Sequence, residues 1–193
     1  MSETTQPPGR RERKKAATRR SLADAALALF LQHGYDQVSI KDVADAADVS
    51  TTTVFKHFPG KEALVFDEDA DEEARLVAVV RERPAGQSLI TALREHVLHT
   101  YLKTSADASF AAFRKLTRET PALRQYGHRM WMRHETALAQ AIAEDAGRPA
   151  DDPAAAALAH FALDSTALTG DREESQAVIE AAFDLLEHGW TGS

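Results

Sequence analysis

The stretch that decides the fold is residues 39–61, which read Ser-Ile-Lys-Asp-Val-Ala-Asp-Ala-Ala-Asp-Val-Ser-Thr-Thr-Thr-Val-Phe-Lys-His-Phe-Pro-Gly-Lys. Its first part has the i, i+3, i+4, i+7 spacing of one apolar helix face, at Ile40, Val43, Ala44 and Ala47. Ser39 stands before this face and Asp42 follows three positions later, which is the spacing of a capping box. The pattern predicts a short helix that begins after Ser39.

A turn at Asp48-Val49 and a second short helix, from about Thr51 to His57, are predicted next. Pro59-Gly60 ends this helix, because proline cannot continue the hydrogen-bond ladder. Helical geometry places Val54 and Phe58 on one side, Thr52 and Lys56 nearly opposite, and Thr53 and Phe55 on the flanks. A short helix with an apolar back and a Thr, Lys and aromatic front fits the major groove of DNA.

The preceding segment completes a three-helix unit. An apolar stripe is formed by Ala23, Ala26, Leu27 and Phe30, and Gly34 occupies the position of a helix C-cap. The unit closely resembles the N-terminal domain of the tetracycline-repressor (TetR) family of transcriptional regulators. The resemblance covers about a quarter of the chain and is carried by residues 27–31, 34–35, 38–39, 43–44, 49–50, 53–58 and 61–64. Phe55 departs from the family, which most often has Tyr there.

The resemblance implies DNA-binding roles. The recognition helix is matched by Thr51, Thr52, Thr53, Phe55, Lys56 and His57. Lys41 matches a position that can reach a base, and Ser39 and Lys61 match positions that anchor phosphates, with Lys61 opening the next helix. A homodimer would place two recognition helices ~34–36 Å apart on a pseudo-palindromic double-stranded operator. Effector binding in the larger domain would tilt the helix starting at Lys61 and spoil that spacing.

The composition is compatible with this reading. The chain has 193 residues, no Cys and a net charge of −7, but the charge is uneven. Basic residues gather near the N-terminus, at Arg10, Arg11, Arg13, Lys14, Lys15, Arg19 and Arg20, where they can neutralise phosphates. No apolar run reaches the ~18 residues of a membrane helix, and the basic N-terminus lacks the apolar segment of a secretory signal, so neither is expected. A soluble cytoplasmic protein without a membrane partner is expected.

The whole chain is predicted to be all-α, with about nine helices. The expected domains are a disordered basic arm (1–12), a helix-turn-helix domain (13–60) and a helical effector-binding and dimerisation domain (61–193). In the last of these, helices are expected at about 60–83, 87–104, 107–119, 121–146, 153–168 and 173–190.

The last two helices carry wide apolar arcs. A four-helix dimer interface is predicted to use Ala155, Leu158, Ala162, Ile179, Ala182, Phe183, Leu186 and Trp190. An adjoining stripe holds Val178, Ala181, Leu185 and Gly189. The alternative is that these helices only close the monomer core; the family resemblance favours the dimer.

The middle helices are rich in aromatic residues with interspersed histidines. The resemblance implies an effector pocket there, and the candidates are Tyr101, Phe110, Phe113, Leu116, Met130, Trp131, His134 and Phe161. The alternative is an ordinary core. The tail at 182–190 is similar to tails in a subgroup that includes regulators of the mycofactocin type, which points to acyl-CoA-like effectors.

Sites for catalysis or metals find little support. His96 and His99 have helical spacing, but no Cys or well-placed carboxylate completes a metal site. His134-Glu135 begins like a zinc-protease motif, yet Leu138 stands where the second His belongs. No cofactor, metal or enzymatic activity is therefore predicted. Two alternatives stay open: a helical enzyme that uses the His-rich middle, and an interaction module that does not bind DNA.

Overall fold

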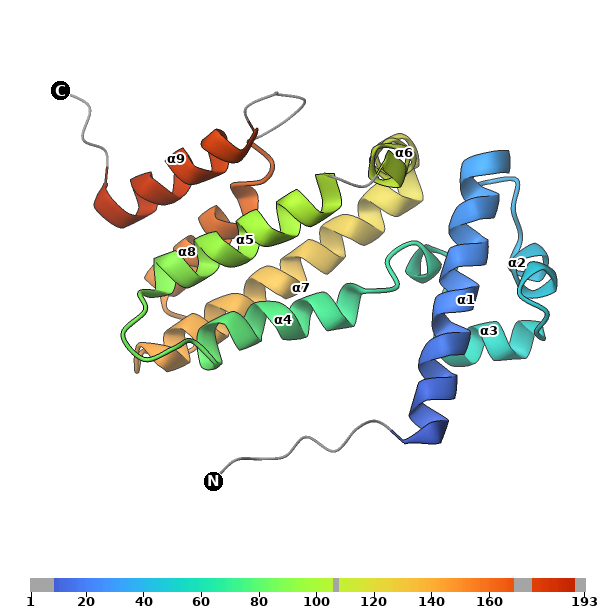
Figure 1. Ribbon diagram of the computed structural model, residues 1–193, viewed down its shortest axis with the longest axis horizontal. Helices are drawn as coiled ribbons and strands as arrows, with labels where there is room; N and C mark the ends of the chain where they lie inside the picture. Colours follow the sequence, from blue (N-terminus) through green and yellow to red (C-terminus); the bar gives the residue numbers. More distant parts are fainter. Residues whose placement is uncertain (1–8, 106–107, 169–174, 190–193) are drawn as a thin grey trace. The chain divides into compact units, whose positions relative to one another are not determined.

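The computed structural model describes residues 9–105, 108–168 and 175–189, and every regular element in this part of the chain is helical. Its elements are α1 (Arg10–His33), α2 (Ile40–Ala46), α3 (Thr51–His57), the 3₁₀ turn η1 (Glu62–Leu64), α4 (Asp69–Arg81), α5 (Leu89–Ser105), α6 (Ala108–Glu119), α7 (Pro121–Asp145), α8 (Pro153–Asp164) and α9 (Ser175–His188) (Figure 1). The all-α prediction is confirmed, and most predicted helices agree with these bounds to within a few residues.

The chain divides into two compact units. Unit 1 contains the described residues of Met1–Asp67 together with Ala112–Gly127, and unit 2 contains those of Glu68–Ala111 and His128–Ser193. The division differs from the predicted boundary at residue 60, and residues 112–127 join unit 1 although they come later in the chain. Phe66 accounts for this, because its ring stacks on Tyr126 (centroids 5.3 Å apart) and meets Phe113 edge-on (6.0 Å).

Unit 1 is built on local signals that the sequence displays. The Ser39 hydroxyl accepts the Asp42 N–H at 3.2 Å, and the Asp42 carboxylate accepts the Ser39 N–H at 2.7 Å, so the capping box at the start of α2 is confirmed. Asp48 takes a left-handed conformation (φ 52°) that turns the chain toward α3. The core beneath the three helices is fully buried and includes Leu22, Ala26, Phe30, Val43, Val54 and Phe58.

Two parts of the prediction for this region need correction. Arg10, Arg11 and Glu12 belong to α1 rather than to a disordered arm, in keeping with the good helix propensity of Arg and Glu. The continuous helix predicted over 60–83 is instead the turn η1 followed by α4, which begins at Asp69. The acidic run at Asp69, Asp71 and Glu72 is the first turn of α4, where the positive end of the helix dipole favours carboxylates.

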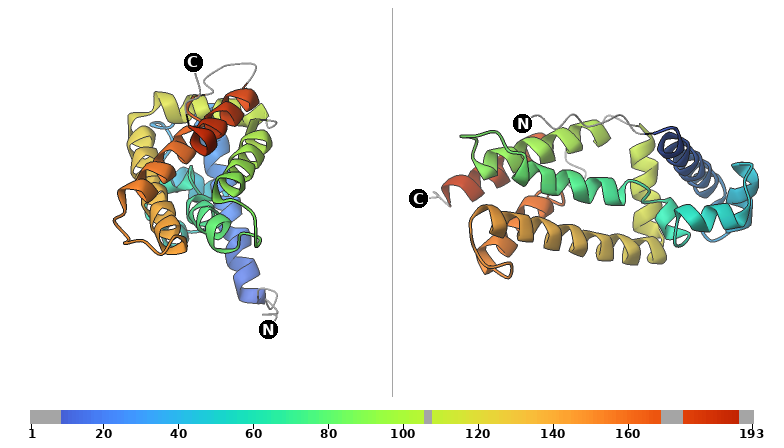
Figure 2. Two further views of the ribbon diagram at one scale, coloured as in Figure 1. Left: turned by 90° about the vertical axis from the view of Figure 1, so that its left-hand side faces the viewer. Right: turned by 90° about the horizontal axis from the view of Figure 1, so that it is seen from below.

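Unit 2 is a helical bundle in which α4 and α9 each pack along α5 (Figure 2). Its buried core takes residues from five helices: Leu76 and Val80 from α4, Leu93 and Val97 from α5, Leu138 and Ile142 from α7, Ala159 and Leu163 from α8, and Ile179 and Phe183 from α9. The core therefore includes Ile179 and Phe183, which were predicted to lie in the dimer interface.

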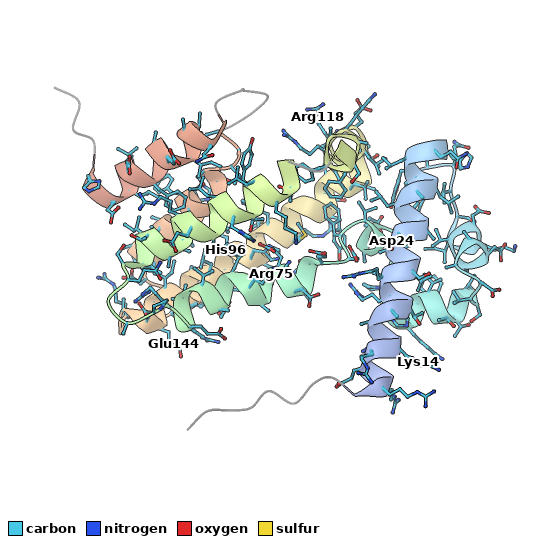
Figure 3. All side chains as sticks on the ribbon, in the orientation of Figure 1. Lys14, Asp24, Arg75, His96, Arg118 and Glu144 are labelled. Carbon is cyan, nitrogen blue, oxygen red and sulfur yellow. The ribbon has the colours of Figure 1, made fainter. Side chains whose placement is uncertain are left out.

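Two histidine–carboxylate pairs hold the start of α4 within unit 2. His134 of α7 is buried and its Nε2 lies 2.8 Å from Asp69 Oδ1, and Asp69 is also paired with Arg133. His96 of α5 places its Nε2 3.3 Å from Glu72 Oε1, beside Arg75 (Figure 3). The first turn of α4 is thus tied to α7 through one carboxylate and to α5 through the other.

The pair at Glu72 predicts acid sensitivity. Contact with His96, helped by Arg75 and opposed by burial, lowers the pKa of Glu72 from 4.5 to about 2. A lowered folded-state pKa means that ionised Glu72 stabilises the fold above about pH 4.5 and that this contribution is lost as the pH falls toward 2. Between pH 5 and pH 2, the free energy of unfolding of the wild type should therefore fall by on the order of 2 kcal/mol more than that of Glu72→Gln.

Urea unfolding followed by circular dichroism at pH 5, pH 3 and pH 2 measures this difference. The control is Glu187→Gln, which neutralises an exposed glutamate of α9 and should retain the acid response of the wild type. If Glu72→Gln and the wild type lost stability in parallel, the pair would not be the acid-sensitive element.

Candidate nucleic-acid interface

The helix α3 presents two chemically different faces. Val54 and Phe58 are 1% exposed and anchor its back to the core of unit 1. On the other side Thr51, Thr52 and Lys56 are exposed, and the Phe55 ring is 58% exposed although it is large and apolar. A helix packed firmly against the core, with a polar, cationic and aromatic outer face, has the chemistry needed to contact base edges and thymine methyl groups.

Both ends of α3 are fixed. At the start, the Thr53 N–H donates to the Ser50 hydroxyl at 3.2 Å, and the Thr53 hydroxyl lies 2.9 Å from the same group. At the other end His57 is half-buried, and burial with the nearby charges of Lys15 and Arg19 lowers its pKa. Its Nδ1 is buried and, among the residues that the structure describes, has no hydrogen-bond partner. These surroundings favour the neutral form of the His57 side chain, which lies half-buried at the end of α3.

Lys41 on α2 and Ser39 before it, both predicted to contact DNA, already have partners within the protein. Lys41 is exposed, and its Nζ pairs with Asp45 Oδ2 at 2.6 Å, an interaction that raises its pKa. The Ser39 hydroxyl donates to Asp42 at 2.7 Å and its N–H also serves Asp42, so both Ser39 donors are used in capping α2. A phosphate at Ser39 would have to compete with the Asp42 carboxylate.

Lys61 differs most from its predicted role. The prediction that Lys61 opens an α-helix is wrong, because Lys61 precedes a three-residue 3₁₀ turn, so no helix dipole strengthens a phosphate contact there. Its ammonium donates to the Tyr35 carbonyl and lies 4.0 Å from the centre of the Tyr35 ring. Burial lowers the pKa of Lys61. The side chain holds the end of the loop after α1, and a phosphate contact would have to displace it from Tyr35.

The basic cluster lies on the first turns of α1. Arg10, Arg11, Arg13, Lys14, Lys15 and Arg20 are exposed, and Figure 3 shows Lys14 on this part of the helix. Arg19 is different, because it is half-buried and engaged inside unit 1. Because these residues lie on a helix, their spacing is fixed, which suits contacts with the DNA phosphate backbone better than a disordered arm would.

The predicted effector residues do not all come together. Tyr101 and Trp131 pack against the core of unit 2, and His134 of the same unit is buried. Met130 and Phe110 are half-buried residues of the same unit. Phe113 and Leu116, however, pack against the core of unit 1, and Phe161 is 56% exposed on α8. Shallow hollows occur at α1 beside Ala47 and Val49, and along α4 beside Val77; none of the predicted residues lines them.

The predicted dimer residues fall into two groups. Ala155, Ala162, Ile179 and Phe183 are buried in the core of unit 2, so the alternative of a monomer core is correct for them. Leu158, Ala182 and Leu186 are half-buried, and Trp190 lies outside the described residues. The apolar surface that stays exposed belongs to the adjoining stripe, with Leu185 46% exposed, and to Phe161. The stripe predicted for the dimer is thus largely the one that faces the core, and the adjoining stripe is the one left exposed.

Comparison with known proteins agrees with the architecture of unit 1. Residues 22–67 match the family of bacterial regulatory proteins named tetR. The chain is 31% identical to the HTH-type transcriptional regulator TcmR of Streptomyces glaucescens over 156 residues, which are 77% of this chain and 69% of TcmR. The chain belongs to the TetR family. It is a helix-turn-helix transcriptional regulator, and the matched residues contain the whole of α2 and α3.

Further relatives extend over more of this TetR-family chain. It is 27% identical to MftR of Mycobacterium tuberculosis, a regulator assigned to mycofactocin biosynthesis, over 92% of this chain and 93% of that protein. The fold is shared with Bacillus subtilis FadR in complex with stearoyl-CoA, at a TM-score of 0.56 and 15% identity, covering 89% of this chain and 98% of FadR. Within the described residues, no helix has the length and apolar character needed to cross a membrane.

Proposed function

We propose that this TetR-family regulator is a repressor that binds a pseudo-palindromic DNA operator as a homodimer and leaves it when a small apolar or amphipathic effector binds. The observation that carries the proposal is the outer face of α3, where an exposed Lys56 and a 58% exposed Phe55 stand on a helix whose back is fully buried. The protein acts through binding in the bacterial cytoplasm, without an enzymatic step.

The reading face proposed for DNA combines Lys56, Phe55, Thr51 and Thr52 with Lys41 on α2. Lys can donate to guanine O6 and N7, and an aromatic ring can contact a thymine methyl group. The exposed basic residues of α1 supply charge for the phosphate backbone, which makes binding dependent on salt. Ser39 and Lys61 remain candidates for phosphate contacts, at the cost of the internal bonds described above.

The homodimer is proposed to form through the exposed apolar surface of α8 and α9, including Phe161, Ala181 and Leu185. Two recognition helices then face successive major grooves ~34–36 Å apart. Large exposed apolar residues on neighbouring helices are the expected signature of a surface that another chain covers. This proposal replaces Ile179 and Phe183 as dimer contacts, because both are 0% exposed within the monomer.

The effector is proposed to be acyl-CoA-like and to bind in unit 2. Tyr101 and Trp131 supply aromatic surface beside the core, and the buried His134, which is paired with Asp69, supplies a polar group in the same unit. FadR, which shares the fold, binds stearoyl-CoA. The effector lowers the affinity for DNA only if it binds the DNA-incompetent conformation more tightly than the competent one.

A ligand screen on protein bound to DNA tests this proposal. Duplexes are first selected from a random pool by the wild-type protein. Acyl-CoAs of graded chain length are then added, with free coenzyme A as the matched control. An effector at 100 times its Kd should raise the Tm by roughly 5–10 °C and release the selected duplex. Binding to DNA without any Tm shift or release across acyl-CoAs and other lipophilic compounds would refute the effector class and leave the DNA-binding role intact.

A further inference from the structure

Arg19 stands apart from the exposed basic residues around it on α1. Its Nη1 donates to the His57 carbonyl at 2.6 Å, and its Nη2 donates to the Asp67 carbonyl at 2.8 Å. Its guanidinium carbon lies 4.2 Å from the centre of the Phe58 ring. One half-buried side chain therefore reaches three groups that lie at least 38 residues away in sequence.

The contacts with the His57 carbonyl and the Phe58 ring hold the end of α3. His57 is the last residue of that helix, and the final carbonyls of a helix have no partner within it. A cation there also suits the negative end of the helix dipole. The Phe58 ring, 1% exposed, gives the guanidinium a flat surface on which to stack. Because α3 spans only Thr51–His57, a clamp on its last turn fixes much of its orientation.

The contact with the Asp67 carbonyl lies where the chain leaves unit 1. Asp67 is the last residue of unit 1 in that segment, and α4 begins two residues later at Asp69. The planar guanidinium offers its donors in a fixed fork, so it holds the carbonyls of His57 and Asp67 at a fixed separation. A displacement of the segment that leads into α4 must either break the bond to Asp67 or be passed to the end of α3.

We propose that Arg19 is a positioning residue that couples the segment entering α4 to the orientation of the recognition helix. This inference rests on the proposed function, in which α3 reads the operator. Arg19 acts on DNA through α3 instead of contacting phosphate, and it converts a shift at residues 67–69 into a loss of operator preference. Lysine cannot replace it, because an ammonium group lacks the fork and the planar stacking surface.

The test compares Arg19→Lys with Arg20→Lys, the same chemical change at an exposed neighbour. Binding to the duplex selected by the wild type and to a scrambled duplex is measured by fluorescence anisotropy over a salt series. Hydrogen exchange is measured on the free proteins. Arg19→Lys should bind the selected duplex about tenfold more weakly, the equivalent of one charge-assisted hydrogen bond, with a smaller loss on the scrambled duplex. Its salt slope should not change, because the charge is kept.

Hydrogen exchange of the free protein would not change if Arg19 only contacted a phosphate, so it distinguishes the two roles. In Arg19→Lys, amides at residues 54–58 and at 67–72 should both exchange faster, while amides at 93–97 in the core of unit 2 stay protected. Arg20→Lys should leave all three segments unchanged. Arg19→Lys with wild-type exchange and wild-type binding would refute the positioning role, and faster exchange in only one of the first two segments would refute the coupling.

The outcome is separable from the proposed function itself. A wild-type protein with no preference for any duplex would contradict DNA reading by α3. The exchange pattern of Arg19→Lys would still show whether the two segments are linked through this side chain.

Discussion

Phe183→Ala is expected to lower the free energy of unfolding by about 3–5 kcal/mol, the usual cost of emptying a buried phenylalanine site. Phe183 is 0% exposed and belongs to the core that joins α9 to α5 in unit 2. The side chains of Leu93 and Ile179 in that core are themselves buried, so the cavity can close only by moving helices. Urea unfolding followed by circular dichroism measures the change.

The matched variant is Leu185→Glu, two residues further along α9. Leu185 is 46% exposed, so a carboxylate there remains hydrated in the monomer, but would be buried without a partner in the proposed dimer. Light scattering should show a monomer for Leu185→Glu with a nearly unchanged circular dichroism spectrum. If Leu185→Glu unfolded the protein while Phe183→Ala only shifted the dimer equilibrium, the two arcs of α9 would be assigned the wrong way round.

Lys56→Ala is expected to weaken binding to the selected operator by about 1–3 kcal/mol, the value of one good contact to a base. Lys56 is exposed on the side of α3 opposite Val54, which is 1% exposed, so its ammonium can reach a base edge without rearrangement of the core. The preference for operator over scrambled duplex should fall with it. Lys103→Ala removes the same charge from an exposed position of α5 and should leave that preference unchanged.

The region from α2 to α3 could be predicted almost to the residue because its signals are local. Ser39 and Asp42 cap each other three positions apart, Ser50 caps α3, and Pro59 ends it. Each of these signals acts through backbone groups of its immediate neighbours, which a sequence displays directly. The faces of α3 follow from helical periodicity, so its exposed front was also predictable.

The partners of long cationic side chains could not be predicted. Arg19 and Lys61 both donate to backbone carbonyls, at His57, Asp67 and Tyr35, in segments distant along the chain. Every residue carries a carbonyl, so no residue type marks such an acceptor. A Lys or Arg that binds a carbonyl inside the protein therefore has the same sequence signature as one that is free to bind a phosphate.

The orientation of α9 posed a different difficulty. Its two apolar arcs are both wide enough to be buried, and periodicity alone does not say which one meets α5. Packing resolves this by placing Ile179 and Phe183 in the core and leaving Leu185 outside. The effector residues were harder still, since Phe113 and Leu116 pack against the core of unit 1, with Phe113 edge-on to the ring of Phe66, and this depends on where residues 112–127 pack.

The most direct test of the central claim is anisotropy of wild-type protein and Lys56→Ala on the selected operator and on a scrambled duplex, at several salt concentrations. The account predicts that the wild type prefers the operator at every salt concentration, and that affinity falls linearly on a log–log plot as salt rises. Lys56→Ala should lose affinity mainly for the operator. Equal losses on both duplexes would reduce Lys56 to a phosphate contact, and a wild type that binds both duplexes equally would contradict base reading by α3.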